Sequence, residues 1–260
     1  MALTYGRYLH LPELLGAQEP LSEGPEHDEM LFIVVHQVYE LWFKQMLHEA
    51  RFLQRVLEQN DTHHALSTLK RMLTILKTLV SQVDVLETMT PMSFSAFRTR
   101  LETASGFQSV QFRELEFVLG HKREGVLAHY PEGSEERALL EAALPASTVW
   151  DSFLGFLHGQ GFEMPEEALR RDPREPVRPT PAVQAVLLRV YRQDALLSQV
   201  CERLVDLDEG LQEWRYRHVK MVERTIGAKA GSGGSSGVAY LQSTLFRSLF
   251  PDLWEIRARL

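Results

Sequence analysis

The feature that most constrains this fold is an unbroken stretch, residues 28–59, that contains neither glycine nor proline. Apolar side chains recur along it three and four positions apart, which is the spacing of one helix face; they are Leu31, Val34, Val35, Val38, Leu41, Trp42 and Met46. The pattern predicts an amphipathic helix far longer than the ~11–12 residues usual in globular proteins. Such a helix gains its stability by packing its apolar face, so it indicates a helical bundle.

The same periodicity continues along most of the chain. Residues 64–88 repeat it, and further helices are predicted over 107–119, 134–143, 148–158, 182–204 and 206–226, with "DLDEG" as an interruption between the last two. Thr90 and Pro91 have the residue types of a helix N-cap and first helical position. Strand and hairpin patterns are absent from the sequence. We therefore predict an all-α fold, a bundle of long antiparallel helices with shorter helices around it.

Two segments depart from this pattern. Residues 160–182 carry five prolines and many charges, and we interpret them as an irregular surface connection because helices resume in the same style afterwards. Residues 227–237 read "GAKAGSGGSSG", a composition typical of flexible linkers. Only a short helix can follow this segment, which is too little for a second domain. We therefore predict one domain over residues 1–260.

Composition and charge exclude several classes of protein. The chain has 260 residues, 44% of them hydrophobic, which is enough to bury a core. Its net charge of −7 and the lack of a long Lys/Arg run give no footprint for nucleic acid. The longest strongly apolar run, Leu31 to Val35, is too short to span a membrane, and no signal peptide is recognisable. The only cysteine, Cys201, reads as a small core residue, so we expect a cytoplasmic protein.

Ten histidines raise the question of a metal site. No zincin spacing is present, because "HEARF" at 48–52 lacks the second histidine. Only His36 and His218 lie within long apolar helices, where each is either an ordinary core residue or a functional imidazole. A single neutral imidazole that projects into an apolar cavity holds haem iron and leaves the opposite position open. Trp214, four residues before His218, shares its helix face.

Two further pairs share a helix face. Phe32 precedes His36 by one turn, and an aromatic ring beside an imidazole suits a flat, partly polar ligand. Phe94 precedes Arg98 by the same spacing, and a guanidinium group matches a carboxylate through two parallel N–H bonds. Ordinary packing and a solvated arginine are the alternative interpretations.

Near the N-terminus, "TYGRYLHL" combines aromatic and aliphatic residues, which predicts docking, since termini fray unless they pack on something. The Gly/Ser-rich segment is not a P-loop, because Lys229 precedes the central glycines.

Taken together, these segments resemble the tryptophan 2,3-dioxygenase family. The resemblance is carried, in the family's order, by "TYGRYLHL", "HDEMLFIVVHQVYELWFKQMLHE" (27–49), "LETMTPMSFSAFR" (86–98), "ASGFQSVQFRELE" (104–116) and "WRYRHVKMVERTIGAKAGSGGSSGVAYL" (214–241). It is weak only over about 121–180. It implies a haem-dependent dioxygenase that inserts both atoms of O₂ across the indole C2–C3 bond of L-tryptophan. The product would be N-formyl-L-kynurenine, in the first step of tryptophan catabolism by the kynurenine pathway.

The resemblance also implies roles for individual residues. His218 matches the proximal ligand of haem b, whose iron is ferrous in the active state and which lies in the helical core. His36 matches the distal histidine, which contacts the indole N–H. Phe32 and Phe94 match the aromatic walls around the indole, and Arg98 matches the residue that pairs with the substrate carboxylate.

The N-terminal segment, residues 1–25, is implied to contact a neighbouring subunit. In it, Tyr5, Tyr8 and Leu9 match residues that complete the neighbour's pocket in the family's homotetramer, a dimer of dimers.

Ser232, inside the segment 227–237, occupies the position that hydrogen-bonds the substrate ammonium and carboxylate. The segment is then a mobile active-site loop whose glycines permit close approach to a ligand. The family usually has threonine here; serine keeps the hydroxyl and loses a methyl group. The alternative is therefore a haem-dependent monooxygenase acting on tryptophan or a substituted tryptophan. A haem-binding bundle without turnover would not need the carboxylate partner Arg98.

Overall fold

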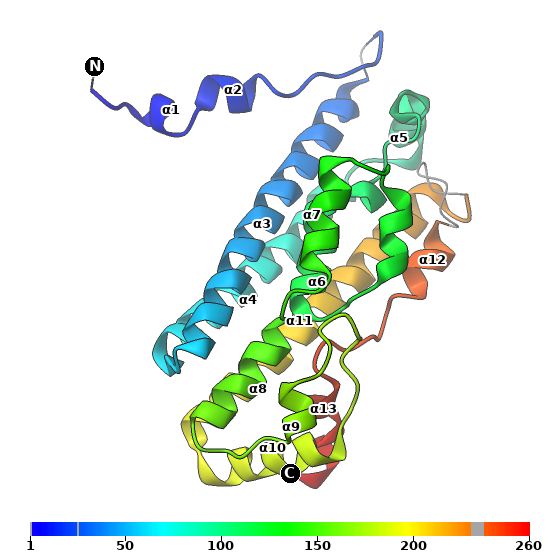
Figure 1. Ribbon diagram of the computed structural model, residues 1–260. Coiled ribbons are helices and arrows are strands. Elements are labelled where there is room, and N and C mark those ends of the chain that lie inside the picture. The colour runs from blue at the N-terminus through cyan, green and yellow to red at the C-terminus, as the bar shows by residue number, and fades with distance from the viewer. Residues whose placement is uncertain (1, 25, 230–236) are drawn as a thin grey trace.

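The computed structural model describes residues 2–24, 26–229 and 237–260, and every regular element within these ranges is a helix (Figure 1). Two helices of 32 residues, α3 (His27–Glu58) and α11 (Ala195–Ile226), both pack against α4 (Thr62–Leu86). The predicted all-α class is confirmed, and the unbroken stretch at 28–59 forms α3 almost residue for residue.

Hydrogen bonds show that α3 and α4 run antiparallel. The Tyr39 hydroxyl donates to the carbonyl of Leu79 over 2.9 Å, and Gln82 Nε2 donates to the carbonyl of Val35 over 3.0 Å. Residues later in α4 therefore meet residues earlier in α3. A short connection after Glu58 reverses the chain, and Asp61 caps α4 by accepting from the amide of His64.

The third long helix runs in the same direction as α4. Gly210 lies against the Leu76 side chain. Two helical turns further along α11, Arg217 donates to Asp84 over 2.5 Å. A Cβ atom at position 210 would lie 3.2 Å from Leu76 Cδ1, which is tighter than ordinary contact. Glycine at position 210 therefore allows α11 and α4 to approach each other closely. It lies within α11 and does not end that helix.

The predicted interruption at "DLDEG" is wrong, and the break lies earlier. Helix α10 (Pro181–Gln193) ends at Asp194, whose side chain accepts hydrogen bonds from the amides of Leu196 and Leu197 at 2.9 Å each. Asp194 is the N-cap of α11, which continues through Gly210 to Ile226. The apolar periodicity continues across Asp194, but the chain begins a new helix there because the aspartate side chain accepts from two amides of the first turn.

Shorter helices surround the three long ones. Thr90 caps α5 (Pro91–Phe97) by accepting from the amide of Ser93 over 3.1 Å, with Pro91 in the first turn, as predicted. The remaining described elements are α1 (Tyr5–Tyr8), α2 (Leu11–Leu15), α5 (Pro91–Phe97), η1 (Arg98–Leu101), η2 (Gly106–Gln108), α6 (Val110–Leu119), η3 (Glu124–His129), α7 (Glu135–Ala143), α8 (Val149–Gly159), α9 (Glu166–Leu169), α12 (Val238–Gln242), α13 (Pro251–Glu255) and η4 (Arg257–Arg259).

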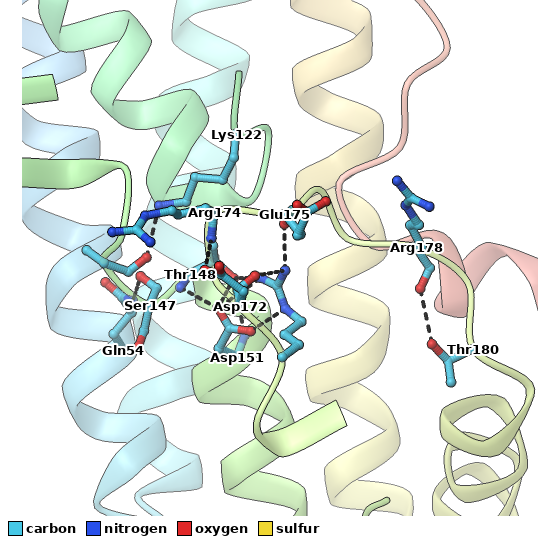
Figure 2. A network of polar contacts seen from close by, with 12 residues as sticks. Gln54, Lys122, Ser147, Thr148, Asp151, Asp172, Arg174, Glu175, Arg178 and Thr180 are labelled. Carbon is cyan, nitrogen blue, oxygen red and sulfur yellow. Dashed lines mark hydrogen bonds and ion pairs between the residues drawn. The ribbon is translucent and has the colours of Figure 1, made fainter. Parts of the chain in front are cut away.

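The proline-rich segment 160–182 contains the single turn of α9 and is joined to the start of α8 by a polar network (Figure 2). Thr148 and Asp151 form a capping box at that start. Arg171 donates to both carboxylate oxygens of Asp151, at 2.5 and 3.0 Å, and to the carbonyl of Glu175 at 2.7 Å. A bidentate ion pair thus holds a segment that has little regular structure.

A buried carboxylate joins the C-terminal segment to α11. Asp208 Oδ2 accepts from the amides of Leu249 and Phe250, at 2.8 and 3.2 Å, and from Trp254 Nε1 at 2.9 Å. Burial raises the pKa of this carboxyl above its usual range, although the three donors oppose the shift. The last part of the chain is therefore fixed against the middle of the bundle.

The main hydrophobic core lies around the N-terminal half of α11, where α3, α4, α8 and α10 contribute side chains. Cys201 is fully buried in it, as predicted, and burial raises the pKa of its thiol to about 12. A smaller cluster lies between the start of α3, the end of α4 and α5. Among the described residues, no helix combines the length and apolar character needed to cross a membrane.

Candidate functional site

A cavity of about 260 Å³ opens between α3, α5, α6, α12 and the C-terminal half of α11. The structure brings five of the predicted site residues to its wall, although they come from three separate parts of the sequence. These residues are Phe32, His36, Phe94, Arg98 and His218. Apolar side chains make up most of the remaining wall, so the cavity suits a largely apolar ligand with a few polar groups.

His218 lies on α11, and its indole neighbour Trp214 lies one turn earlier. The two rings stack almost in parallel, with centroids 5.5 Å apart and planes 13° apart. Desolvation, assisted by His36 and by the guanidinium groups of Arg113 and Arg215, lowers the pKa of His218 to about 4. The imidazole is therefore neutral at physiological pH and has a lone pair with which to ligate a metal.

His36 lies on the wall of the same cavity, on α3, and it is neutral as well. Its Nδ1 atom lies 2.7 Å from the carbonyl of Phe32, which can only accept, so Nδ1 carries the proton. Burial lowers the pKa of His36. Nε2 is consequently a hydrogen-bond acceptor, which suits a ligand that presents an N–H group.

Aromatic rings form the wall beside His36. The Phe32 ring centroid lies 4.0 Å from that of His36 and 5.8 Å from that of Phe94, and Phe97 closes the cluster behind them at 5.5 Å from Phe32. These tilted and edge-on arrangements are the ones that aromatic rings prefer. The cluster forms an aromatic wall of the cavity on which another aromatic ring could pack.

Arg98 begins η1, directly after α5, and it lies on the cavity wall close to Phe94 in sequence. The change from α-helix to 3₁₀-helix at this residue follows the N-cap at Thr90 by only two turns. The arrangement places a guanidinium group at one side of an apolar cavity, where a carboxylate ligand would be bound through charge-assisted hydrogen bonds.

A buried charge cluster at the α6 side of the cavity was not predicted from the sequence. Glu116 Oε2 accepts from Arg113 at 2.5 Å and from Arg123 at 2.6 Å, and its Oε1 accepts from Arg215 at 2.6 Å. Burial alone would raise the pKa of Glu116, but the three guanidinium groups outweigh it and lower the pKa to about 2. Spacing indicates only the Arg113–Glu116 pair, three residues apart on α6, because Arg215 lies on another helix.

Tyr5, Tyr8 and Leu9 do not line the cavity of their own chain. They lie on and after α1, in a segment that extends away from the bundle (Figure 1). The two tyrosines are 75% and 69% exposed. Ser232 lies outside the described residues; the described ends of its loop are Gly227 and Gly237, which both have positive φ, and Gly237 reaches the cavity wall.

The residues present fit the haem group that the sequence resemblance implies. Among the described residues, no group of three or more His, Cys, Asp or Glu side chains is placed to hold a metal ion. A haem iron needs only one protein donor, because its other donors come from the porphyrin. A porphyrin supplies four such donors, and one neutral imidazole completes the set on one side. His218 provides that imidazole in a mostly apolar cavity.

Comparisons with known proteins show the family of this chain. The family model for tryptophan 2,3-dioxygenase matches residues 1–141 and 170–260. A relative named tryptophan 2,3-dioxygenase from Herpetosiphon aurantiacus is 60% identical over all of this chain and 99% of its own length. Relatives of the same name from Anaeromyxobacter dehalogenans and Caulobacter vibrioides are 61% and 44% identical, covering 100% and 99% of this chain and 97% and 98% of their own. Fold and cavity define an all-α protein with a neutral imidazole in a mostly apolar cavity. The chain belongs to the tryptophan 2,3-dioxygenase family.

Proposed function

We propose that this chain is a haem-dependent dioxygenase that inserts both atoms of O₂ across the indole C2–C3 bond of L-tryptophan, giving N-formyl-L-kynurenine. The observation that carries the proposal is the meeting of His36 and His218 in one cavity with the Phe32–Phe94 pair and Arg98. Membership of the family supports the same reaction. The reaction would begin the catabolism of tryptophan by the kynurenine pathway.

His218 would hold the iron of haem b, and ferrous haem, when bound, supplies the activation of O₂. The parallel stack with Trp214 limits rotation of the imidazole ring, so its lone pair keeps one direction. The lowered pKa keeps that lone pair free of a proton over the physiological range.

Arg98 would bind the substrate carboxylate, and the Phe32–Phe94 surface would hold the indole ring. Together they fix both ends of tryptophan, which converts the reaction into one between oriented groups. The mostly apolar wall disfavours competing water. Each of the two indole carbons gains one oxygen atom as the bond between them breaks, so no external reductant is consumed.

His36 would accept the indole N–H through Nε2, because Nδ1 is committed to the carbonyl of Phe32. Indole is electron-rich, so addition of oxygen to it does not require a strong base. We therefore assign His36 to orientation of the ring rather than to obligatory proton removal. A protonated imidazole could not accept this bond, and the lowered pKa of His36 guards against protonation.

The loop at 227–237 would close over the polar end of the substrate, with Ser232 hydrogen-bonding the ammonium. Gly227 and Gly237 have φ values of 58° and 62° at the described ends of the loop. Residues with side chains rarely adopt this conformation, so the glycines suit a chain that leaves α11 and returns to the same cavity.

The chain would act as a cytoplasmic homotetramer, with Tyr5, Tyr8 and Leu9 completing a neighbour's pocket. Their exposure, in a segment that leaves the bundle, supports this arrangement (Figure 1). We expect mixed oligomers of Tyr8→Ala and His218→Ala subunits to regain activity, since an intact Tyr8 would then reach an intact His218 of another chain. Failure of the mixture to exceed the separate variants, despite confirmed subunit exchange, would contradict the role of Tyr8 in a neighbouring pocket.

The test of the reaction is mass spectrometry of the product formed from L-tryptophan under ¹⁸O₂. Incorporation of two labelled atoms into N-formyl-L-kynurenine is the expected result. A product with one labelled atom, formed only with an external reductant, would instead identify a monooxygenase. Absence of a Soret band after reconstitution with haem would exclude both.

A further inference from the structure

A second cavity, of about 400 Å³, lies between α8, α9, the start of α10 and α13. Residues of the segment 171–180 also contribute to its wall, and Figure 2 shows part of that segment. This cavity shares no lining residue with the one that His36 and His218 line, and the proposed reaction does not use it. Its volume is in the range of sites that bind small molecules.

The buried part of this wall is apolar. Trp150, Leu154 and Val183 line it and are each at most 2% exposed. The Trp150 ring is held by a stack with Phe250, with centroids 5.6 Å apart and planes 26° apart. The wall is therefore a fixed apolar surface, which suits the apolar part of a ligand.

A buried carboxylate belongs to the same wall. Asp252 is 1% exposed, and its Oδ1 accepts from the amide of Thr180 at 2.6 Å and from Gln184 Nε2 at 3.1 Å. Within the described ranges, no donor is bonded to its Oδ2 and no cationic side chain pairs with it. Burial raises the pKa of this carboxyl above its usual range, and Glu255 adds to the rise. A cation in the cavity would compensate the buried carboxylate.

Negative charge predominates among the other charged groups of this wall. Three more carboxylates line it, those of Glu167, Asp172 and Glu175. Of the two arginines that line it, Arg171 is already paired with Asp151, at 2.5 and 3.0 Å. Four carboxylates, that of Asp252 included, are thus accompanied by one further guanidinium group, that of Arg178. This balance favours a positively charged ligand.

We propose that the second cavity binds a small organic amine, whose protonated nitrogen pairs with Asp252 Oδ2 and whose apolar part lies against Trp150 and Val183. The carboxylates suit an organic cation, because no group of three or more His, Cys, Asp or Glu side chains in the described parts of the chain is placed to hold a metal ion. The excess of carboxylates disfavours an amino acid, whose own carboxylate they would repel. A bound amine would connect α13 to the wall formed by α8 and α10.

The test measures binding of 2-phenylethylammonium to the holoprotein by isothermal titration calorimetry. Asp252→Asn removes the charge and keeps an oxygen for Thr180 and Gln184. Glu255→Gln is the matched control, because it removes a carboxylate from the same helix outside the cavity wall. Ala168→Phe adds bulk to the wall from α9 and leaves Asp252 in place, so it replaces Asp252→Asn if that variant does not fold. Circular dichroism establishes that each variant keeps its helices.

We expect Asp252→Asn to weaken binding of the amine about 10- to 100-fold, because it removes a charge-assisted contact. Ala168→Phe should abolish binding, whereas Glu255→Gln should stay within about 3-fold of wild type. The neutral analogue 2-phenylethanol should bind to wild type at least about 10-fold more weakly than the amine. Absence of binding to wild type at millimolar amine, or wild-type affinity in both Asp252→Asn and Ala168→Phe, would overturn the proposal.

Phe32→Ala shows which of the two cavities the amine occupies. Phe32 lines only the cavity of the candidate site, so this variant should bind the amine as wild type does. If Phe32→Ala weakens binding and Asp252→Asn does not, the amine lies in the cavity of the candidate site and the proposal is overturned. That result would leave the proposed dioxygenase function untouched.

Discussion

The two halves of α11 use the same helix for different purposes, and the contrast appears in their buried polar groups. In the first half, Asp208 Oδ2 accepts three hydrogen bonds, all from the C-terminal segment. In the second half, Arg215 reaches Glu116 and His121 and still keeps an unpartnered Nε, as does the indole of Trp214. Asp208 Oδ1 is also buried without a hydrogen-bond partner, but Asp208 does not line the cavity, whereas Arg215 and Trp214 do. Unused polar atoms that border a cavity are the ones that indicate a ligand.

Replacing His218 by alanine should distinguish the roles of the two halves of α11 most clearly. We expect turnover to fall by a factor of at least about 1,000, because the iron would lose its protein ligand. The Soret band should be lost or weakened at the same protein concentration. Chemical unfolding of the apoprotein should change little, since the ring faces the cavity. Wild-type haem retention in this variant would remove His218 from the site.

Arg98→Ala tests the polar side of the cavity from outside α11. One buried charge-assisted contact is worth roughly 1.5–3 kcal/mol, so the apparent KM for L-tryptophan should rise about 10- to 100-fold. Haem content should remain at the wild-type level, measured from the Soret absorbance per subunit. Unchanged steady-state kinetics would mean that Arg98 does not contact the substrate carboxylate.

Leu204→Ala is the matched change in the structural half. Leu204 is fully buried in the main core, so truncation should lower the free energy of unfolding by about 2–5 kcal/mol. The KM of the remaining folded protein should stay within about 2-fold of wild type, because the residue lies away from the cavity. Denaturant titration and steady-state kinetics below the melting range measure the two effects. A large change in KM with little loss of stability would contradict the division of α11.

Asp208→Asn should change the free energy of unfolding least. The pH dependence of that change tests whether Asp208 titrates. Asparagine keeps an oxygen for the donors of the C-terminal segment, so unfolding at pH 7 should change by no more than about 1–2 kcal/mol. The folded pKa of Asp208 is raised, so its stabilisation is complete below the unfolded pKa and is lost as pH rises through the folded pKa. Denaturant titrations from pH 4 upward should therefore show that wild type loses stability relative to the variant. A constant difference over that range would mean that Asp208 does not titrate there.

Sequence periodicity predicted the long helices well because their apolar faces are continuous. It misplaced the break near α11 because the signal at Asp194 is one side chain on two amides, whereas Gly210 looks like a helix breaker and is in fact a point of close packing against Leu76. Local propensity could not show this, since the reason lies on α4. Whether such a glycine ends a helix depends on the residue that packs against it.

The candidate site divides in the same way. Phe32 with His36, and Phe94 with Arg98, are pairs at helical spacing, so each pair could be proposed from the sequence. That both pairs lie in one cavity with His218 was implied by the family resemblance, and the structure places all five residues on its wall. Beyond the Arg113–Glu116 pair, the Glu116 cluster has no sequence signature, because Arg215 lies 99 positions from Glu116 and Arg123 lies in a loop. Such clusters are a property of tertiary packing.

The Asp208 bonds have a consequence for how the chain is made. Their donors, Leu249, Phe250 and Trp254, follow Asp208 by 41, 42 and 46 positions. During synthesis α11 is therefore complete before these donors exist, and until they arrive its buried carboxylate lacks all three hydrogen bonds. Domains generally fold as units, so the packing of α11 follows synthesis of this segment. A truncation before Leu249 would leave the helix that bears His218 without its anchor.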